Sequence, residues 1–371
     1  MRILQIIDHV GVDAGISSVV MNLYRNMDYT KIQFDFLVCS KREESYENEI
    51  VSRGGKLFFV GNPLSVREIG SACYNVNLFF KEHAEEYKIV QLHSPTMALF
   101  TLRYAKKYGV EKRIVHSHST MTSTNKLKCV ANRFLMEQVF RYGNEFWACS
   151  TEAAVFLYGE KFCSEKRFEI IWNAVDTKKF TFVEEIRNRV RNEYHLNDYC
   201  VVAHVSNFSP IKNVSFLIPV MKNVIRKRKD IRFLFIGEGP TWAGFKQEVE
   251  CFELSEYCVF MGRVHNVQDY LQGADLLLLP SLKEGLPISV IEAQASGLEC
   301  LLSDTITKEV DVGSVKYLPL KESVWEQEIG NREVISQKQR QERSELFRKS
   351  RFNIINEAAR VEKLYLTLES R

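Results

Sequence analysis

The feature that most constrains the fold is a run of four leucines, residues 276–279, followed by a turn and a short helix. An apolar run of this length is typical of a strand that is buried on both faces of a sheet. The helix is expected between Pro287 and Gly297, because proline favours the first turn of a helix and glycine the position after its last residue. A buried strand therefore leads to the N-terminus of a helix, where backbone N–H groups and the helix dipole favour an anion such as phosphate.

Two glutamates lie in this segment, Glu284 in the loop and Glu292 in the helix, with seven residues between them. A carboxylate repels a phosphate, so both side chains are expected to contact other parts of a ligand. Helical side chains lean toward the N-terminus of their helix, so Glu292 can reach a vicinal diol such as that of ribose. Glu284 follows the strand and would contact the opposite end of the ligand. From the spacing alone, a loop glutamate and a solvated helical glutamate remain an equal alternative.

Residues 275–297 resemble the Glu-x7-Glu donor-site motif of the retaining glycosyltransferases of family 4, which have the GT-B fold. The resemblance implies an α/β protein with two doubly wound Rossmann-like domains that face each other across a cleft. It implies that Glu292 binds ribose and Glu284 the transferred sugar of a nucleotide-sugar. The donor would also contact the loop and helix start at Gly285, Leu286, Pro287, Ile288 and Ser289.

The rest of the chain alternates strand and helix patterns, which predicts parallel sheets with ligands at the carboxyl ends of the strands. Strands are expected at 2–7, 33–38, 56–60, 89–93, 113–116, 145–149, 200–205, 232–236, 259–264, 276–279 and 300–303. A chain of 371 residues is too long for one ordinary core. We expect an acceptor-binding domain at 1–177, a nucleotide-sugar-binding domain at 178–352, and an amphipathic terminal helix at 353–371 that returns to the first domain.

The loop at residues 206–213 resembles the family's Gly-Arg-x4-Lys-Asn segment, whose two cations neutralise the donor diphosphate. Lys212 matches the lysine, but Asn207 stands in place of the arginine and Ser206 in place of the glycine. One cation is therefore missing, which puts full catalytic strength or the donor's identity in doubt. Arg263 is a candidate to compensate for it.

Three further positions are implied to contact the donor. Gly15 follows the first strand where the family has a Gly-Gly pair, although Ala14 replaces the first glycine and a plain turn is the commoner role. Gly237 opens a Gly-x-Gly turn, and the backbone around Val264 would hold the nucleotide base.

Histidines gather at the expected strand ends, at His93, His116 and His118. His116 and His118 end a strand pattern, and we expect their rings to point to opposite sides of that strand. The segment resembles the family's acceptor-side histidine segment, which implies that His118 lines the cleft beside the reacting sugar. His116 is then the structural histidine.

The helical pattern at residues 125–142 carries basic side chains that include Lys126 and Lys128. A core-packed helix with a solvated face is the simpler interpretation. By family resemblance it is also a candidate for contact with an anionic membrane and a lipid-linked acceptor. Charge reversal at the two lysines without effect on vesicle binding would contradict that hypothesis.

Composition excludes several classes of protein. A formal charge of +3 predicts no general affinity for nucleic acid, and nine scattered cysteines without a C-x-x-C pair are typical of reduced thiols. We expect no signal peptide and no transmembrane helix, hence a cytoplasmic protein, at most peripheral at the inner face of the cell membrane.

We therefore interpret the chain as a retaining, metal-independent glycosyltransferase, with His118, Lys212 and Glu284 as catalytic residues. By resemblance, the donor is a nucleotide-sugar, with UDP as the commonest choice in the family. The acceptor is a cell-surface glycan such as a capsular or exopolysaccharide, and no cofactor is expected. Two alternatives remain: a glycan- or partner-binding protein on a degenerate scaffold, and a nucleotide-sugar epimerase.

Overall fold

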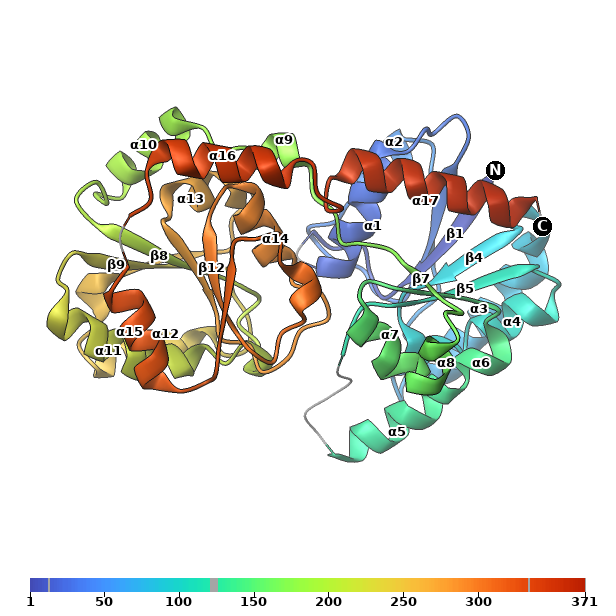
Figure 1. Cartoon of the computed structure of the whole chain (residues 1–371). Helices are drawn as coiled ribbons and strands as arrows, with labels where there is room; N and C mark the ends of the chain where they lie inside the picture. Colours follow the sequence, from blue (N-terminus) through green and yellow to red (C-terminus); the bar gives the residue numbers. More distant parts are fainter. Residues whose placement is uncertain (13, 121–125, 333, 371) are drawn as a thin grey trace. The chain divides into compact units, whose positions relative to one another are not determined.

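The computed structural model describes residues 1–12, 14–120, 126–332 and 334–370, without the side chains of residues 126–130. It divides into two compact units, Met1–Ala174 together with Ile354–Arg371, and Val175–Asn353 (Figure 1). No helix in these described ranges is long and apolar enough to cross a membrane.

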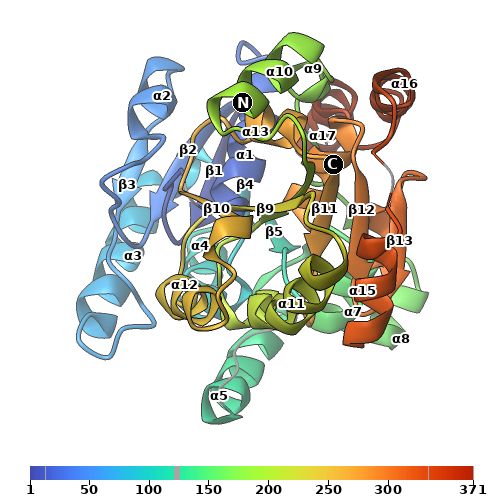
Figure 2. The ribbon, with the colours of Figure 1, turned by 90° about the vertical axis from the view of Figure 1, so that its left-hand side faces the viewer.

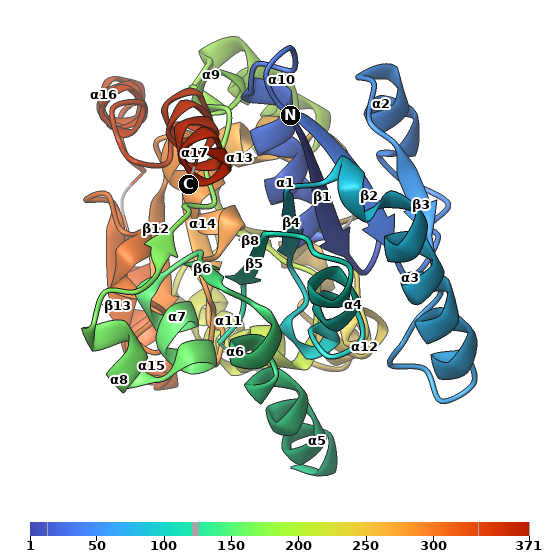
Figure 3. The same cartoon turned by 90° about the vertical axis from the view of Figure 1, so that its right-hand side faces the viewer.

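The first unit contains a seven-stranded parallel sheet with the strand order β3-β2-β1-β4-β5-β6-β7. Its strands are β1 (Arg2–Ile7), β2 (Gln33–Val38), β3 (Leu57–Phe59), β4 (Ile89–Leu92), β5 (Lys112–Ser117), β6 (Glu145–Ala148) and β7 (Glu169–Ile170). Its helices are α1 (Gly15–Asn26), α2 (Glu47–Ser52), α3 (Ile69–His83), α4 (Leu102–Lys107), α5 (Lys126–Glu137), α6 (Val139–Tyr142), α7 (Thr151–Tyr158), α8 (Glu160–Ser164) and α17 (Ile354–Glu369), with short 3-10 turns at Ala84–Glu86 and Pro95–Met97. Helices α1 and α17 cover one face of the sheet, and α4, α6 and α7 lie over the other (Figure 3).

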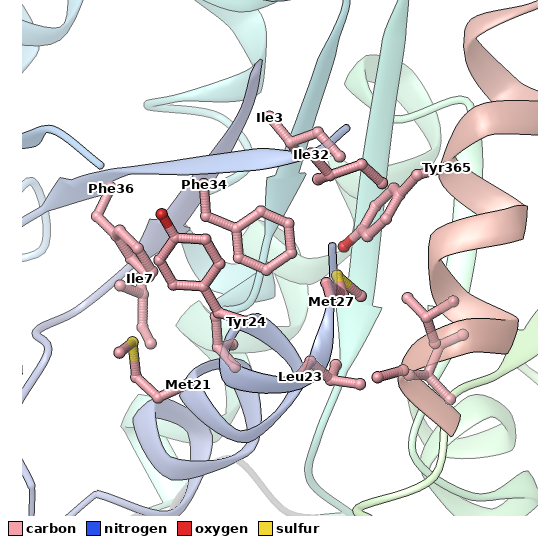
Figure 4. Close-up of a cluster of buried hydrophobic side chains, with 14 of the residues drawn as sticks. Ile3, Ile7, Met21, Leu23, Tyr24, Met27, Ile32, Phe34, Phe36 and Tyr365 are labelled. Carbon is pink, nitrogen blue, oxygen red and sulfur yellow. The ribbon is translucent and has the colours of Figure 1, made fainter. Parts of the chain in front are cut away.

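The terminal helix α17 packs against α1 and belongs to the first unit. Its apolar face belongs to a cluster in which Tyr24 stacks on Phe34 with ring centroids 5.0 Å apart. Tyr365 of α17 meets Phe34 edge-on, with ring centroids 5.9 Å apart (Figure 4). Its ring centroid also lies 5.0 Å from that of Trp147. The helix that ends the chain therefore completes the core of the unit that begins it.

The second unit contains a six-stranded parallel sheet with the strand order β10-β9-β8-β11-β12-β13. Its strands are β8 (Cys200–Val205), β9 (Ile231–Ile236), β10 (Cys258–Gly262), β11 (Leu276–Leu279), β12 (Glu299–Ser303) and β13 (Val315–Leu318). Its helices are α9 (Thr177–Phe180), α10 (Glu184–Glu193), α11 (Leu217–Lys227), α12 (Trp242–Cys251), α13 (Val267–Gly273), α14 (Ile288–Ala295), α15 (Glu322–Gly330) and α16 (Gln337–Phe347), with 3-10 turns at Pro210–Lys212, Val214–Phe216, Ser255–Tyr257 and Lys308–Val310. Helices α10, α13 and α16 lie on one side of the sheet and α11, α12 and α15 on the other (Figure 2).

The four leucines of β11 are all buried, as the sequence predicts for a central strand. The strand is held at its base by Asp275, whose carboxylate pairs with Arg187 at 2.5 Å and Arg191 at 3.0 Å. The same carboxylate accepts the N–H of Val201 at 2.7 Å, which joins it to β8. These contacts fix the position at which β11 begins beside β8.

The basic segment that includes Lys126 and Lys128 forms the helix α5, but the side chains of both lysines lie outside the described residues. Membrane contact through them stays a prediction.

Candidate functional site

The strand order of the second sheet reverses between β8 and β11, because the chain continues outward from these neighbours in opposite directions. In open parallel sheets, such a switch point leaves a crevice at the carboxyl ends of the strands, where ligands bind. The loops that follow β8 and β11 are joined there. The Leu282 N–H donates to the Ile211 carbonyl at 2.8 Å, and the Asn213 side-chain amide donates to the Pro280 carbonyl at 3.2 Å.

Lys212 and Glu284 form an ion pair across this switch point. The Lys212 Nζ donates to the Glu284 Oε1 at 2.6 Å, and the two side chains are only 16% and 12% exposed. Two partly desolvated side chains of this kind form a strong charge-assisted hydrogen bond. A ligand that carries both an anionic group and hydroxyl groups can replace Glu284 as the partner of Lys212, or Lys212 as the partner of Glu284. From the sequence we expected Lys212 and Glu284 to contact separate parts of a ligand. In the structure they also contact each other.

The N-terminus of α14 follows the same loop. Its first hydrogen bonds run from the amides of Val290 and Ile291 to the Pro287 carbonyl, so the amides of Ile288 and Ser289 precede the bonded turns. Gly285, Leu286 and Pro287 are buried and carry the backbone from Glu284 into the helix. The structure therefore places the predicted loop and helix start next to the Lys212–Glu284 ion pair, which was not predicted.

Glu292 lies one turn into α14 and is partly buried. Burial raises the pKa of its carboxyl group to about 7, and the charge of Lys179 acts in the opposite direction. Among the described residues, no side-chain hydrogen bond satisfies this carboxyl group. A partly buried carboxyl group with a raised pKa is a candidate for ligand binding. Glu292 is therefore not the fully solvated glutamate of the alternative interpretation.

Replacing Glu292 with glutamine is expected to stabilise the protein at pH 8 but not at pH 4.5. The unfolded carboxyl titrates near its ordinary pKa of 4.5 and the folded one near 7, so wild type loses stability as the pH rises between these values. Glutamine carries no charge at either pH, and the gain at pH 8 should be about 1–2 kcal/mol. Urea unfolding of both proteins across this pH range measures it. An equal difference at both pH values would contradict the raised pKa.

Gly237 and Gly239 allow the loops after β8 and β9 to touch. A Cβ at Gly237 would lie 1.9 Å from the Ser206 carbonyl oxygen, and one at Gly239 would lie 1.8 Å from that of Asn207. These distances are far below van der Waals contact, so only glycine fits either position. The predicted Gly-x-Gly turn therefore holds the Ser206–Asn207 backbone at the edge of the crevice.

The other residues that are expected to contact the donor are more exposed than Lys212 and Glu284 or lie further along the sheet. The exposed Asn207 side chain accepts the Ser209 hydroxyl at 3.0 Å. Arg263 is exposed and Val264 half-buried, and both follow β10, which β9 separates from β8. Compensation of the missing cation by Arg263 and base contact at Val264 stay predictions.

The first unit has its own switch point, between β1 and β4. Gly15 begins α1 beyond the carboxyl end of β1, and its contact with a donor stays a prediction. His93 follows β4 at the same edge, and its Nδ1 lies 2.8 Å from the Nε2 of His118.

The expectation that His116 and His118 point to opposite sides is wrong. Their ring centroids lie 4.0 Å apart, with the rings tilted by 35°. Side chains two positions apart along a strand share a face, and His118 directly follows the last residue of β5, so its ring lies beside that of His116. His116 is fully buried, as a structural histidine would be, whereas His118 is partly exposed.

Burial keeps the three imidazoles neutral. It lowers the pKa of His118 to about 3 and holds the pKa values of His93 and His116 well below their usual range. A neutral imidazole donates one hydrogen bond and accepts another. The cluster thus suits a polar, uncharged group such as a hydroxyl.

Comparison with known proteins agrees with this geometry. Residues 199–319 match the family model of glycosyl transferases group 1, and residues 14–179 match that of glycosyltransferase family 4. The chain is 32% identical to the putative glycosyltransferase EpsF of Bacillus subtilis, over 85% of this chain and 83% of that protein. It is 25% identical to a UDP-Gal:alpha-D-GlcNAc-diphosphoundecaprenol alpha-1,3-galactosyltransferase of Escherichia coli, over 62% of this chain and 61% of that protein.

Among solved structures, the chain resembles HepE of Anabaena in complex with UDP and glucose. The TM-score is 0.79 at 14% identity, and the match covers 99% of this chain and 100% of that one. At this identity the likeness speaks for the fold alone, and it confirms the expected GT-B class.

Proposed function

The chain belongs to the glycosyltransferases of family 4, and from this membership we propose that it moves a sugar from a UDP-sugar to a glycan acceptor with retention of the anomeric configuration. The observation that carries the proposal is the Lys212–Glu284 pair at the β8–β11 switch point, next to the N-terminus of α14. A cation, a helix N-terminus and a carboxylate are together what a sugar diphosphate requires.

Each residue has a role in this proposal. Lys212 and the amides at the start of α14 bind the diphosphate, Glu284 accepts hydrogen bonds from hydroxyls of the transferred sugar, and Glu292 binds the ribose hydroxyls. When the donor enters, the diphosphate takes over the Lys212 contact, and Glu284 is released toward the sugar. The ion pair therefore keeps both groups oriented before binding.

The reaction proceeds by front-face displacement. The bond between the anomeric carbon and the diphosphate oxygen breaks, its electron pair leaves with UDP, and the acceptor oxygen bonds to the same face of the carbon. The departing diphosphate takes the proton of the acceptor hydroxyl. Lys212 and the helix amides stabilise the charge that develops on the leaving group, so the proposal assigns this task to no metal ion.

The UDP base and the acceptor are inferred from relatives. The Escherichia coli relative is named for a UDP-galactose donor and a diphosphoundecaprenol-linked acceptor, and the HepE structure contains UDP. We propose a UDP-sugar donor and a growing cell-surface glycan, lipid-linked, as acceptor. Contact of α5 with an anionic membrane on the cytoplasmic side belongs to the same proposal.

The test is a transfer assay with a panel of UDP-sugars and undecaprenyl-diphosphate-linked acceptors, with and without EDTA. Release of UDP, together with an α-linked product from an α-linked donor in the NMR spectrum, is the expected result. Inversion at the anomeric carbon would contradict the retaining mechanism. An epimerised donor without acceptor would favour the epimerase, and glycan binding without any turnover the binding protein.

A further inference from the structure

Six polar side chains form one continuous hydrogen-bonded chain inside the first unit. They come from β1, β4, β5, the segments that follow β4 and β5, and the terminal helix α17. Their order is His118, His93, Gln5, Tyr365, Gln91 and His116. All but His118 are buried. None of the six carries a charge at neutral pH, because burial lowers the pKa of each histidine and raises that of Tyr365.

The two glutamines give the chain a direction. The Gln5 Nε2 donates to the Tyr365 hydroxyl at 3.5 Å, and this hydroxyl donates to the Gln91 Oε1. The Gln91 Nε2 lies 2.9 Å from the His116 Nδ1, to which it donates. Each residue of the chain accepts one hydrogen bond and donates the next one, so all hydrogen bonds run in the same direction, from Gln5 through Tyr365 and Gln91 to His116.

The direction fixes the tautomers at the other end. The Gln5 Oε1 accepts from the His93 Nε2–H at 2.7 Å, so the His93 Nδ1 carries a lone pair. This lone pair must accept from the His118 Nε2–H at 2.8 Å. In a neutral imidazole the second nitrogen is then an acceptor, so His118 keeps a lone pair at Nδ1.

The two ends of the chain meet. The His116 Nε2–H is buried and has no hydrogen-bond partner among the described residues. Its ring lies 4.0 Å from that of His118, measured between centroids. One end therefore offers an acceptor and the other a donor, which together match a hydroxyl group, since a hydroxyl both donates and accepts.

We propose that Gln5, His93, Gln91 and Tyr365 are positioning residues that hold His118 in its Nε2–H tautomer, with Nδ1 as the hydrogen-bond acceptor for a sugar hydroxyl of the substrate. The inference deepens the proposed function, because it gives the His118 imidazole a defined chemical state. The terminal helix takes part directly, since the Tyr365 hydroxyl is the only link between the two glutamines among the described residues. Burial of the imidazoles keeps them neutral and so preserves the direction of the chain.

A three-histidine metal centre is the rival explanation, because ligand nitrogens of His93, His116 and His118 all lie within 4.8 Å of one another. Zinc bonds to nitrogen at about 2.0–2.1 Å, which places tetrahedral neighbours about 3.3 Å apart. The His93–His118 pair at 2.8 Å is too close for two ligands of one ion and has the length of a hydrogen bond. The geometry therefore favours the hydrogen-bonded chain.

The direct test is the tautomer of His118 in the wild-type protein. Selective ¹⁵N labelling of the eight histidines and long-range ¹H–¹⁵N spectra at pH 7.5 distinguish Nδ1–H from Nε2–H rings. We expect His118, His93 and His116 to be single Nε2–H tautomers. An Nδ1–H ring or a mixture at His118 would overturn the proposal, as would a shift of all three rings by one equivalent of Zn²⁺.

Variants then test the positioning role. Gln5→Met removes the acceptor of His93 while it keeps the apolar length, and His118 should become a tautomer mixture with kcat lowered about tenfold and UDP affinity unchanged. His204, held by the Leu278 carbonyl and the Ser206 hydroxyl in the second unit, is the internal control and should not shift. An unchanged His118 spectrum in folded Gln5→Met would contradict the proposal. The spectra need no turnover, so failure of the transferase assay would leave this test standing.

Discussion

Replacing Lys212 with methionine is expected to lower kcat for sugar transfer by about 100- to 1,000-fold, because removal of one preformed charge-stabilising group from an active site has effects of this size. Lys212 supplies the only cation of the resembled diphosphate segment, since Asn207 stands where the arginine is expected. Initial rates with saturating UDP-sugar measure the effect. UDP affinity should also fall, because the diphosphate loses its charged partner.

Two further variants separate catalysis from folding. Lys212→Met alone leaves Glu284, whose side chain is 12% exposed, without its partner and should destabilise the protein. The double variant Lys212→Met/Glu284→Gln should recover stability but not activity. Lys227→Met, at the exposed end of α11, is the matched control and should leave kcat unchanged. Full activity in folded Lys212→Met would refute the assigned role.

Replacing Val361 with aspartate is expected to destabilise the first unit by more than about 4 kcal/mol, because it buries a carboxylate without a partner. Val361 is completely buried in the face of α17 that completes the core of that unit. This cost is a large part of a typical folding free energy of about 5–15 kcal/mol, so the protein should unfold at low urea or precipitate. Chemical unfolding followed by circular dichroism measures it.

Ile355→Asp is the matched control for this prediction. Ile355 lies on the same helix but is 49% exposed, so the change should cost less than about 0.5 kcal/mol. Similar losses of unfolding free energy in both variants would contradict the prediction that the buried face of α17 stabilises the first unit.

The strands of the fold were predictable because most are continuous apolar runs between turn signals. β1, β2, β8 and β11 begin and end at the predicted residues. β13 was not predicted, because it lies at the edge of its sheet and its residues Lys316 and Tyr317 interrupt the apolar pattern. An edge strand needs only one neighbour and carries a weaker sequence signal.

The local structure around the candidate site was predictable where one segment carries it, as in the loop and helix that contain Glu284 and Glu292. It was not predictable where distant segments meet. Lys212 and Glu284 are separated by 72 positions, and nothing in either segment indicates that they pair. From the sequence, Asp275 only marked the start of a strand. Its ion pairs with the buried Arg187 and Arg191 could not be predicted.

The hydrogen-bonded chain in the first unit has a sequence signal that is visible only in retrospect. Gln5 and Gln91 interrupt otherwise apolar strands, where an amide is costly unless it is hydrogen-bonded. Such a residue indicates a buried polar partner but does not identify it. The partner Tyr365 is 274 positions away from Gln91 and is known only from the fold.

A nucleotide-sugar site in the second unit is tested most directly by UDP binding to wild type, Glu292→Ala and Glu250→Ala in calorimetry and thermal unfolding. UDP at 100 times its dissociation constant should stabilise wild type by about 2.7 kcal/mol. Loss of the charged hydrogen bonds to ribose should weaken binding to Glu292→Ala about 10- to 100-fold, while Glu250→Ala, at an exposed position of α12, should bind as wild type does. Absence of UDP binding to folded wild type, or equal affinity in Glu292→Ala, would contradict a UDP-sugar site at this position.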